Sequence, residues 1–320
     1  MHPLLTRSID RVIIRLATSA IPSAQRHEAH AAEAAALLDH LDFFSNEAQA
    51  PADFFLTQQN EFEFLSSIAT PWENNNRVRG KLFPCAGDWE KFPTVILLHG
   101  WNDELGYRFR FPYVATLLRR HRINAVAMEL PYHLRRRPTS ANAISDFISA
   151  DLWRMVEATR QSIADARSLE KWLRARGSPQ IGLWGSSLGA WLGGLILCHD
   201  PEINVAVLTT PIAKLDCAIN DLPFCAPIRA SFEGTNLSLA KLNLSSHRPK
   251  APLHRVLIQE SVDDLFASKE AIEEVWRAWG QPEIWRLRHG HISVLMSVPV
   301  MKRTVNWIAQ KFGETSKSRS

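Results

Sequence analysis

The sequence predicts an α/β protein with a mostly parallel central sheet and helices on both faces. Two observations support this fold class. Short apolar runs alternate with helix-like segments from residue 93 to residue 312. The run Thr94–Leu98 is also apolar without interruption, which is typical of a strand buried on both faces. The chain has 320 residues, of which 46% are hydrophobic, so it is long enough for one large α/β domain or two ordinary ones.

The first part of the chain has a different pattern. Alanine and leucine recur at helical spacing between His27 and Phe44, which predicts a helix there. Two short strands, 65–70 and 78–83, are expected to form an antiparallel edge of the sheet. The predicted organisation is a helical accessory segment, a main domain and a flexible polar tail, with the boundaries 1–60, 61–313 and 314–320.

The main domain repeats strand and helix in a regular order. The predicted strands are 94–98, 124–128, 181–184, 204–208, 254–258 and 283–287. The predicted helices are 111–122, 144–176, 188–198, 272–279 and 294–312. Because the crossovers between parallel strands are right-handed, the carboxyl ends of these strands should meet along one edge of the sheet.

One interval, 214–252, interrupts this order. It carries prolines at positions that include 223, 227 and 249, and it has no clear period of either helix or strand. A connection this long is typical of an insertion that covers a site, so we expect a lid-like insertion over the carboxyl edge of the sheet. The alternative is a surface excursion without a role. Its apolar residues Phe224, Leu237 and Leu239 could line a pocket or anchor the segment to the core.

Composition and motifs exclude several classes of protein. The formal net charge is only +4, and the clusters Arg119–Arg122 and Arg135–Arg137 are explained by solvated helix ends, so a nucleic-acid partner is not expected. The chain contains no phosphate-binding loop, dinucleotide fingerprint, HExxH motif or paired CxxC motif. Neither an organic cofactor nor a metal is therefore expected. Oligomeric state cannot be predicted from these features.

Cysteine usage and the N-terminal residues bear on location. The four cysteines do not form a disulfide framework, although Cys217 and Cys225 could pair, and Cys198 is expected to be a buried thiol. Residues 1–20 lack the apolar core of a signal peptide, and no window of about 18 residues is apolar enough to span a bilayer. The cytoplasm is the expected compartment. We expect the N-terminal helix to pack on its own domain rather than lie on a membrane.

The most informative motif is Gly185-Ser186-Ser187-Leu188-Gly189, which lies between a predicted strand and a predicted helix. In this context the chain turns so sharply at the central serine that only small residues fit on either side. The turn projects the Ser187 hydroxyl from the sheet edge and directs the first N–H groups of the helix toward the same space. Ser187 is therefore the predicted nucleophile of a nucleophile elbow.

A serine hydroxyl needs a base to accept its proton and a third group to orient that base. Two histidines, His289 and His291, follow the predicted strand 283–287. We predict that His291 is the base, because Gly290 gives the backbone freedom to direct the next side chain over the sheet edge. His289 is the alternative, and it is expected to pack or bond locally.

The carboxylate of a catalytic triad is expected in the loop after the strand that ends at Ile258. Glu260, Asp263 and Asp264 all occur there. We predict Asp263, since five residues beyond the strand is a suitable reach for a loop that turns back toward the histidine. Asp264 is the second choice and Glu260 the third. A carboxylate in this place would fix the tautomer of the imidazole and stabilise its protonated form.

Stabilising an oxyanion requires two convergent donors. One is expected to be the backbone N–H of Leu188, at the start of the helix. The other is expected from the loop after the strand 94–98, where the backbone N–H of Trp101 is the candidate and Gly100 permits close approach. His99 is expected to brace this turn rather than to act as a base.

Together these residues resemble the α/β-hydrolase superfamily. The resemblance rests on His99-Gly100 after a buried strand, on the elbow at Ser187, on Asp263 after a late strand and on His291 near the end, in the order nucleophile, acid, base. It covers about residues 77–312. Glu260 departs from the pattern, because many members have a glycine there, and this leaves the choice between Asp263 and Asp264 open. More narrowly, three motifs are similar to the group around abhydrolase domain-containing protein 18, namely Glu129–His133, Arg135–Pro138 and Gly290–Ser293.

The resemblance implies an α/β-hydrolase fold and a serine hydrolase that cleaves an ester or a related acyl bond of a small molecule through an acyl-enzyme. In this interpretation the triad is Ser187, Asp263 and His291, and the oxyanion donors are Leu188 and Trp101. Two alternatives stay open. The first is a catalytically silent binding protein on the same fold. The second is a hydrolase of amide, thioester or carbon–carbon bonds.

Overall fold

The computed structural model describes residues 3–18, 21, 30–44, 49–138 and 147–317. Within these residues the strands form one nine-stranded sheet in the order β1-β2-β3-β5-β4-β6-β7-β8-β9. The strands are β1 (Phe55–Leu56), β2 (Glu61–Leu65), β3 (Arg77–Phe83), β4 (Thr94–Leu98), β5 (Asn124–Met128), β6 (Ile181–Ser186), β7 (Val205–Thr209), β8 (Val256–Ser261) and β9 (Glu283–Leu287). The helices are α1 (Pro3–Ala17), α2 (Ala31–Asp39), α3 (Glu73–Asn76), α4 (Phe111–Arg119), α5 (Leu152–Ala175), α6 (Leu188–His199), α7 (Leu215–Asp221), α8 (Ala226–Phe232), α9 (Lys269–Ala278), α10 (His291–Leu295) and α11 (Val298–Lys317).

The sheet is parallel from β5 through β9 and antiparallel at the β1-β2-β3 edge. The predicted fold class is therefore confirmed. Parallel pairing places Leu98 of β4 opposite both Met128 of β5 and Gly185 of β6. The loops that leave these three strands consequently begin side by side, and this alignment brings distant parts of the sequence together.

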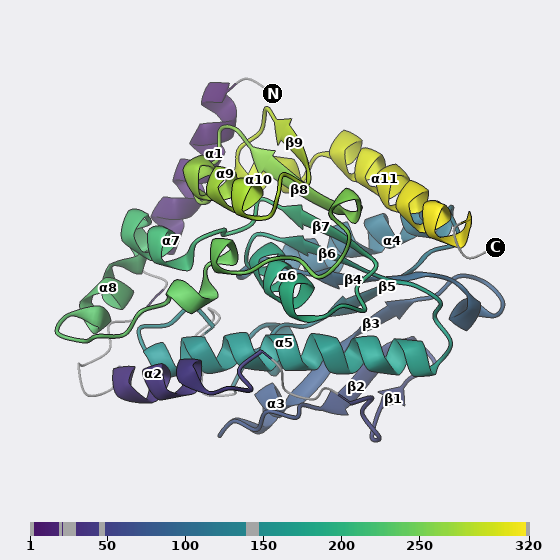
Figure 1. Ribbon diagram of the computed structural model, residues 1–320, viewed down its shortest axis with the longest axis horizontal. Coiled ribbons are helices and arrows are strands. Elements are labelled where there is room, and N and C mark those ends of the chain that lie inside the picture. The colour runs from purple at the N-terminus through teal and green to yellow at the C-terminus, as the bar shows by residue number, and fades with distance from the viewer. Residues whose placement is uncertain (1–2, 19–20, 22–29, 45–48, 139–146, 318–320) are drawn as a thin grey trace.

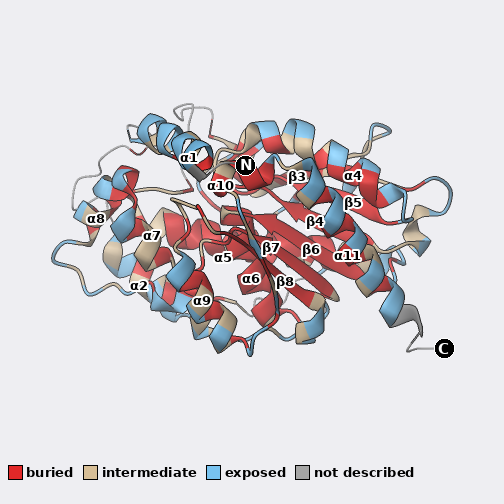
Figure 2. Ribbon diagram, turned by 90° about the horizontal axis from the view of Figure 1, so that it is seen from above, coloured by how far each residue is buried: buried red, intermediate tan, exposed pale blue. Residues whose placement is uncertain are grey.

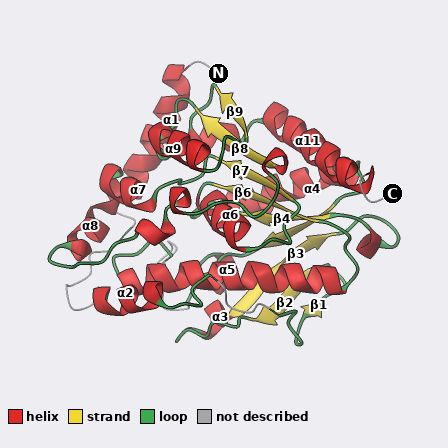
Figure 3. Ribbon diagram, viewed as in Figure 1, coloured by secondary structure: helices red, strands yellow, loops and turns green. Residues whose placement is uncertain are grey.

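Helices cover both faces of the sheet, as Figures 1 and 3 show. The two faces carry separate apolar cores because alternate side chains of a strand point in opposite directions. In β4, Val95 and Leu97 belong to the core under α4 and α11, whereas Ile96 and Leu98 belong to the core under α5 and α6. The central strands are buried along their full length (Figure 2).

Several element boundaries differ from prediction. The first edge strand is Glu61–Leu65 rather than 65–70, and residues 73–76 form the short helix α3. Strand β8 continues to Ser261, three residues beyond the predicted end. The predicted closing helix 294–312 is two helices, α10 and α11, with Pro299 in the first turn of α11. The start of the predicted helix 144–176 lies partly outside the described residues.

The N-terminal segment is more closely integrated with the domain than its expected accessory role implied. Helix α2 packs on α5, and α1 contacts α10. Residues Phe55–Leu56, inside the range predicted to be helical, form strand β1 of the sheet. Helix α1 is seen beside α10 in Figure 2. At the other end of the chain, α11 continues to Lys317 through part of the predicted flexible tail.

The interval 214–252 is helical in part. It forms α7 and α8, followed by two short 3₁₀ turns at 240–242 and 244–246. Leu239 is buried in the main core and Leu237 packs against it, so both residues anchor the interval to the domain. The third apolar residue, Phe224, lies in a 3₁₀ turn between α7 and α8 and is also buried.

Two further predictions concern the burial of Cys198 and the presence of membrane-spanning helices. Cys198 is buried, as expected, near the end of α6. Among the helices that the structure describes, none has both the length and the apolar character needed to cross a bilayer.

Candidate active site

Ser187 occupies the tight turn between β6 and α6, with φ 54° and ψ −117°. A non-glycine residue rarely adopts this conformation, and its cost is on the order of 1–3 kcal/mol. The two glycines of the motif are needed for steric reasons. A Cβ at Gly185 would collide with the backbone of Gly189, and a Cβ at Gly189 would collide with the carbonyl oxygens of Leu98 and His99. The sequence motif therefore folds into the predicted elbow geometry.

A chain of two hydrogen bonds links this serine to the C-terminal part of the protein. The Ser187 hydroxyl lies 2.8 Å from His291 Nε2, and His291 Nδ1 lies 2.8 Å from an oxygen of Asp264. The imidazole and the Asp264 carboxylate are nearly inaccessible to solvent, with exposed side-chain fractions of 4% and 2%. An Nδ1–H that donates to Asp264 leaves Nε2 unprotonated, so it can accept the serine proton.

The carboxylate at His291 belongs to Asp264, and the choice of Asp263 is therefore corrected. Because β8 runs on to Ser261, Asp263 is the second residue after the strand and not the fifth. Its backbone N–H donates to the carbonyl oxygen of His289, 3.0 Å away. Its side chain lies 3.5 Å from both Thr6 Oγ1 and Arg7 Nε of α1. Asp263 thus contacts the N-terminal helix, while the next residue contacts His291.

The electrostatic surroundings of His291 favour its protonated form. Burial lowers the pKa of the imidazole, but the neighbouring Asp264 carboxylate raises it, and Asp10 and Asp103 add to this effect. The net direction is upward from the ordinary histidine value. A base with this pKa retains a strong affinity for the proton that it would accept from the serine.

The remaining candidates for base and acid lie elsewhere. His289 Nδ1 is 3.3 Å from Ser293 Oγ, and burial lowers the pKa of this imidazole. His289 therefore bonds locally, whereas His291 faces Ser187. Glu260 lies within β8 and forms an ion pair of 3.1 Å with Arg286 of β9.

The loop after β4 lies against the elbow. A Cβ built at Gly100 would lie 3.4 Å from the Ser187 Cβ, in van der Waals contact with it, so this loop passes directly beside the serine. Trp101 follows on the same loop, and Leu188 is the first residue of α6, whose N–H has no intrahelical acceptor. The two predicted oxyanion donors thus belong to adjoining backbone segments at the serine.

His99 braces this loop. Its Nε2 accepts a hydrogen bond of 3.1 Å from the Leu130 N–H, so Nδ1 carries the proton and donates to the Gly100 carbonyl oxygen, 2.8 Å away. Burial lowers the pKa of His99 to about 4, and the side chain is neutral at physiological pH. It ties the loop after β4 to the loop after β5, which is the structural role that we expected.

A buried arginine fixes the loop after β5. The Arg136 guanidinium is fully buried, pairs with Asp165 of α5 at 2.8 Å and donates to the carbonyl oxygens of Asn75 and Glu129. Complete pairing of this kind is what makes a buried charge tolerable. The next residue, Arg137, donates to the side-chain oxygen of Asn102 in the loop after β4, 3.3 Å away. The arginine cluster 135–137 is therefore structural here and not a solvated helix end.

A row of aromatic rings runs from the loop after β4 to His291. Trp101 stacks on Phe224 of the 214–252 interval, with ring centroids 5.4 Å apart. Phe224 in turn lies near Phe266, whose ring centroid is 4.7 Å from that of His291. These four rings connect the loop after β4, the insertion and His291 through a continuous row of aromatic contacts.

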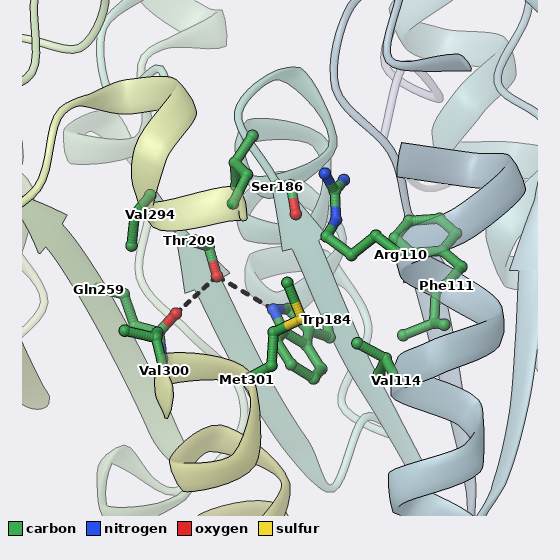
Figure 4. A pocket seen from close by; sticks show the side chains of 12 residues that line it. Arg110, Phe111, Val114, Trp184, Ser186, Thr209, Gln259, Val294, Val300 and Met301 are labelled. Carbon is green, nitrogen blue, oxygen red and sulfur yellow. Dashed lines mark hydrogen bonds between the residues drawn. The ribbon is translucent and has the colours of Figure 1, made fainter. Parts of the chain in front are cut away.

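A small cavity lies behind the elbow, on the face covered by α4 and α11 (Figure 4). Its polar lining forms a chain in which Trp184 Nε1 donates to Thr209 Oγ1 at 3.0 Å and Thr209 donates to Gln259 at 2.7 Å. Ser186 lines this cavity, but Ser187 and His291 do not. It is therefore a packing space beneath the sheet edge and not the entrance for a substrate.

In the part of the chain that the structure describes, no three histidine, cysteine, aspartate or glutamate side chains are placed to hold one ion.

Comparison with known families identifies a match in the central part of the chain. Residues 58–226 match the model of the family described as alpha/beta hydrolase domain containing 18. The match covers more than half of the 320 residues. It includes Ser187 and ends before Asp264 and His291.

Two curated proteins of Mycobacterium tuberculosis are also similar. They are the uncharacterized proteins MT2702 of strain CDC 1551 and Rv2627c of strain H37Rv, each 26% identical over 228 residues. The alignment covers 67% of this chain and 53% of each relative. The chain thus spans about half the length of the curated relatives that it matches.

Solved structures with the same fold include three hydrolase-type chains. The Pyrococcus furiosus esterase Pf2001 has a TM-score of 0.55 at 18% identity, covering 80% of this chain and 93% of its own. The α/β hydrolase GrgF from Penicillium sp. sh18 has a TM-score of 0.53 at 13% identity, covering 78% and 98%. Est1E from Butyrivibrio proteoclasticus has a TM-score of 0.52 at 12% identity, covering 74% and 95%. At these identities the likeness establishes the fold.

Proposed function

The chain belongs to the alpha/beta hydrolase domain containing 18 family, and from this premise we propose that it is a serine hydrolase that cleaves an ester or a related acyl bond of a small molecule. The observation that carries the proposal is the unbroken contact from Ser187 through His291 to Asp264, with both distances at 2.8 Å. Family and fold make hydrolysis the expected class of reaction, and the three side chains supply its parts.

In the proposed first step, the Ser187 oxygen attacks the substrate carbonyl carbon while His291 Nε2 takes the hydroxyl proton. Asp264 accepts the Nδ1–H bond throughout, which holds the ring orientation and stabilises the imidazolium. The backbone N–H groups of Leu188 and Trp101 are the proposed donors to the oxyanion. Losing one such donor commonly costs about two to three orders of magnitude in turnover.

The second half of the reaction reverses the proton movements. His291 gives its proton to the leaving group, and the bond between the carbonyl carbon and that group breaks to leave an acyl-enzyme on Ser187. Water then attacks the acyl carbon, with His291 again as the base, and the acid product leaves with the serine restored.

The interval 214–252 is proposed to form a lid-like cover for the acyl group. The contact of Phe224 with Trp101 supports this proposal, because it brings an apolar side chain of the insertion beside the proposed oxyanion loop. An apolar wall with few polar groups is typical of sites that bind acyl chains.

The decisive experiment is labelling with a fluorophosphonate probe, followed by mapping of the adduct by mass spectrometry. We expect the wild-type protein to be labelled at Ser187 and the Ser187→Ala variant to show no labelling and no hydrolysis of small activated esters. Ser186→Ala is the matched control, because this neighbouring hydroxyl lines the cavity behind the elbow. A folded wild-type protein that is neither labelled nor active would favour a binding protein instead.

A substrate panel then defines the bond that is cleaved. Esters of increasing acyl length, with the corresponding thioesters and amides, should be hydrolysed at rates that rank the ester first. Faster turnover of the amide or thioester would overturn the ester assignment while leaving the Ser187 nucleophile intact.

A further inference from the structure

Helix α1 inserts a buried carboxylate between the two loops that carry the triad residues. The Asp10 side chain is inaccessible to solvent, with 0% of the residue exposed. One of its oxygens accepts hydrogen bonds from the backbone N–H groups of His291, at 2.8 Å, and Leu265, at 3.3 Å. The other accepts from the Ile292 N–H at 3.1 Å. One side chain thus holds backbone next to both His291 and Asp264.

Asp10 supplies what the sequence around α10 lacks. His291 and Ile292 are the first two residues of α10, so their N–H groups have no acceptor within the helix. The residue before them is Gly290, which has no side chain to cap them. The Asp10 carboxylate caps the two groups from 281 and 282 residues away in the sequence. A helix that begins at its own catalytic histidine is therefore held by the N-terminal helix.

Gly290 is also explained by this contact. A Cβ on Gly290 would lie 2.8 Å from an Asp10 oxygen and 3.0 Å from the Thr6 carbonyl oxygen. The first contact would displace the Asp10 carboxylate, and the second would require the Thr6 backbone to give by a few tenths of an ångström. The glycine that we expected to free the His291 backbone instead makes room for α1 against it.

We propose that Asp10 is a positioning residue of the active site. By bonding to the backbone of both segments, it fixes the position of the His291 imidazole relative to the loop that carries Asp264. The proposal rests on the serine hydrolase function proposed above. If Asp10 has this role, α1 contributes directly to the geometry of the active site and is not an accessory helix. Asp10 touches neither Ser187 nor the imidazole ring in a hydrogen bond, so it acts through the residues that it holds.

Charge gives the proposal a second, independent readout. Three carboxylates face His291: Asp264 from the loop after β8, Asp10 from α1, and Asp103 from the loop after β4, where Asp103 is itself paired with Arg110. The ring also contacts the Ser187 hydroxyl and the Phe266 ring. Burial lowers the pKa of His291 and these carboxylates raise it, so removing the charge of Asp10 should lower it.

The test compares Asp10→Asn and Asp10→Ala with wild type, and uses Arg7→Gln as the matched control. Arg7 lies on the same helix and its ion pair with Asp263 does not touch His291, so its loss loosens α1 without uncapping α10. We expect about a 10- to 100-fold fall in kcat for the Asp10 variants, with KM changed only a few-fold, because misplacement of a base acts on the chemical step. The acid limb of the kcat/KM profile should move to lower pH in these variants and stay in place in Arg7→Gln.

A titration of His291 by NMR provides a measurement that does not depend on substrate, and a His291→Gln sample assigns the signal. We expect a lower pKa for this imidazole in Asp10→Asn than in wild type. An unlabelled, inactive wild-type protein would refute the hydrolase proposal, while the titration would still test Asp10. Unchanged kcat and unchanged His291 pKa in Asp10→Asn would overturn the inference, as would an equal loss of kcat in Arg7→Gln. If Asp10→Ala does not fold, Asp10→Asn, which keeps the size and one acceptor oxygen, carries the test.

Discussion

At the scale of single residues, Asp263 and Asp264 show that the distance of a residue from the end of a strand does not decide which carboxylate reaches His291. The two side chains leave adjacent positions of one loop in different directions. Asp264 reaches His291 at 2.8 Å, and Asp263 lies 3.5 Å from Arg7 on the surface helix α1. Both are aspartates at a plausible distance from the strand, so their local sequence does not distinguish them.

This difference gives a paired prediction. Asp264→Asn should lower kcat by about three to four orders of magnitude, because an asparagine neither stabilises the imidazolium nor enforces the required tautomer. Asp263→Asn should stay within about threefold of wild type, because its contacts are with α1. Hydrolysis of an activated ester, measured alongside circular dichroism, checks both variants. A large loss in Asp263→Asn with normal activity in Asp264→Asn would reverse the proposed assignment.

At the scale of elements, α5 carries a buried carboxylate next to the loop after β5. Helix α5 begins after Asp151, whose side chain caps it by accepting from the Arg154 N–H at 3.2 Å. One turn further, Glu157 is 3% exposed and accepts a hydrogen bond of 3.0 Å from the Tyr132 hydroxyl. Burial raises the pKa of Glu157 from 4.5 to about 7. The folded protein therefore retains a proton on Glu157 that the unfolded chain releases.

The sign of the resulting pH dependence follows from linkage. Between pH 4.5 and about 7 the unfolded chain has released this proton while the folded protein still holds it. The free energy of unfolding therefore decreases as the pH rises through this range, and the whole destabilisation by Glu157 is present above pH 7. Glu157→Gln removes this titration and keeps an acceptor for Tyr132. We expect the variant to be more stable than wild type by roughly 2 kcal/mol at pH 8, and by much less at pH 5. Urea unfolding at the two pH values measures the difference, and an equal gain at both would contradict the explanation.

At the scale of the whole molecule, the site is assembled from segments that lie far apart in the chain. The elbow follows β6, the imidazole begins α10, the carboxylate follows β8, and the bracing residue comes from α1. Figure 1 shows α1, from the start of the chain, close to the elements α9, α10 and β9 near its end. The insertion adds Phe224 to the same region by stacking on Trp101.

The proposed cover predicts a change in substrate preference. Phe224→Ala should raise KM for esters with longer acyl chains several-fold and change kcat for an acetyl ester little, because it removes apolar wall and not catalytic groups. Phe232→Ala, on the same insertion and packed against the main core, is the matched control for general loosening. Steady-state kinetics across an acyl series distinguish the two. The same KM change at all chain lengths, or in both variants, would argue against a role of Phe224 in binding the acyl group.

The fold could be predicted well where the signal is local. Strands β4, β5 and β9 begin and end where the sequence indicates. For β4 and β5 the reason is local, because a nearly continuous apolar run bounded by polar or turn residues defines a buried strand on its own. The ends of β8 and the break between α10 and α11 could not be located in this way. They depend on pairing with β9 and on packing around Pro299, and neither is visible in a short window of sequence.

Sequence alone determined the parts that obey local steric rules. The glycines on either side of Ser187 are demanded by a turn of five residues, and the alternation of strand and helix settles which edge that turn occupies. Only the tertiary structure decided which carboxylate meets His291 and that Asp10 caps its helix. Those contacts join segments up to 282 residues apart, and their geometry depends on how whole elements pack, which no pattern of neighbouring residues encodes.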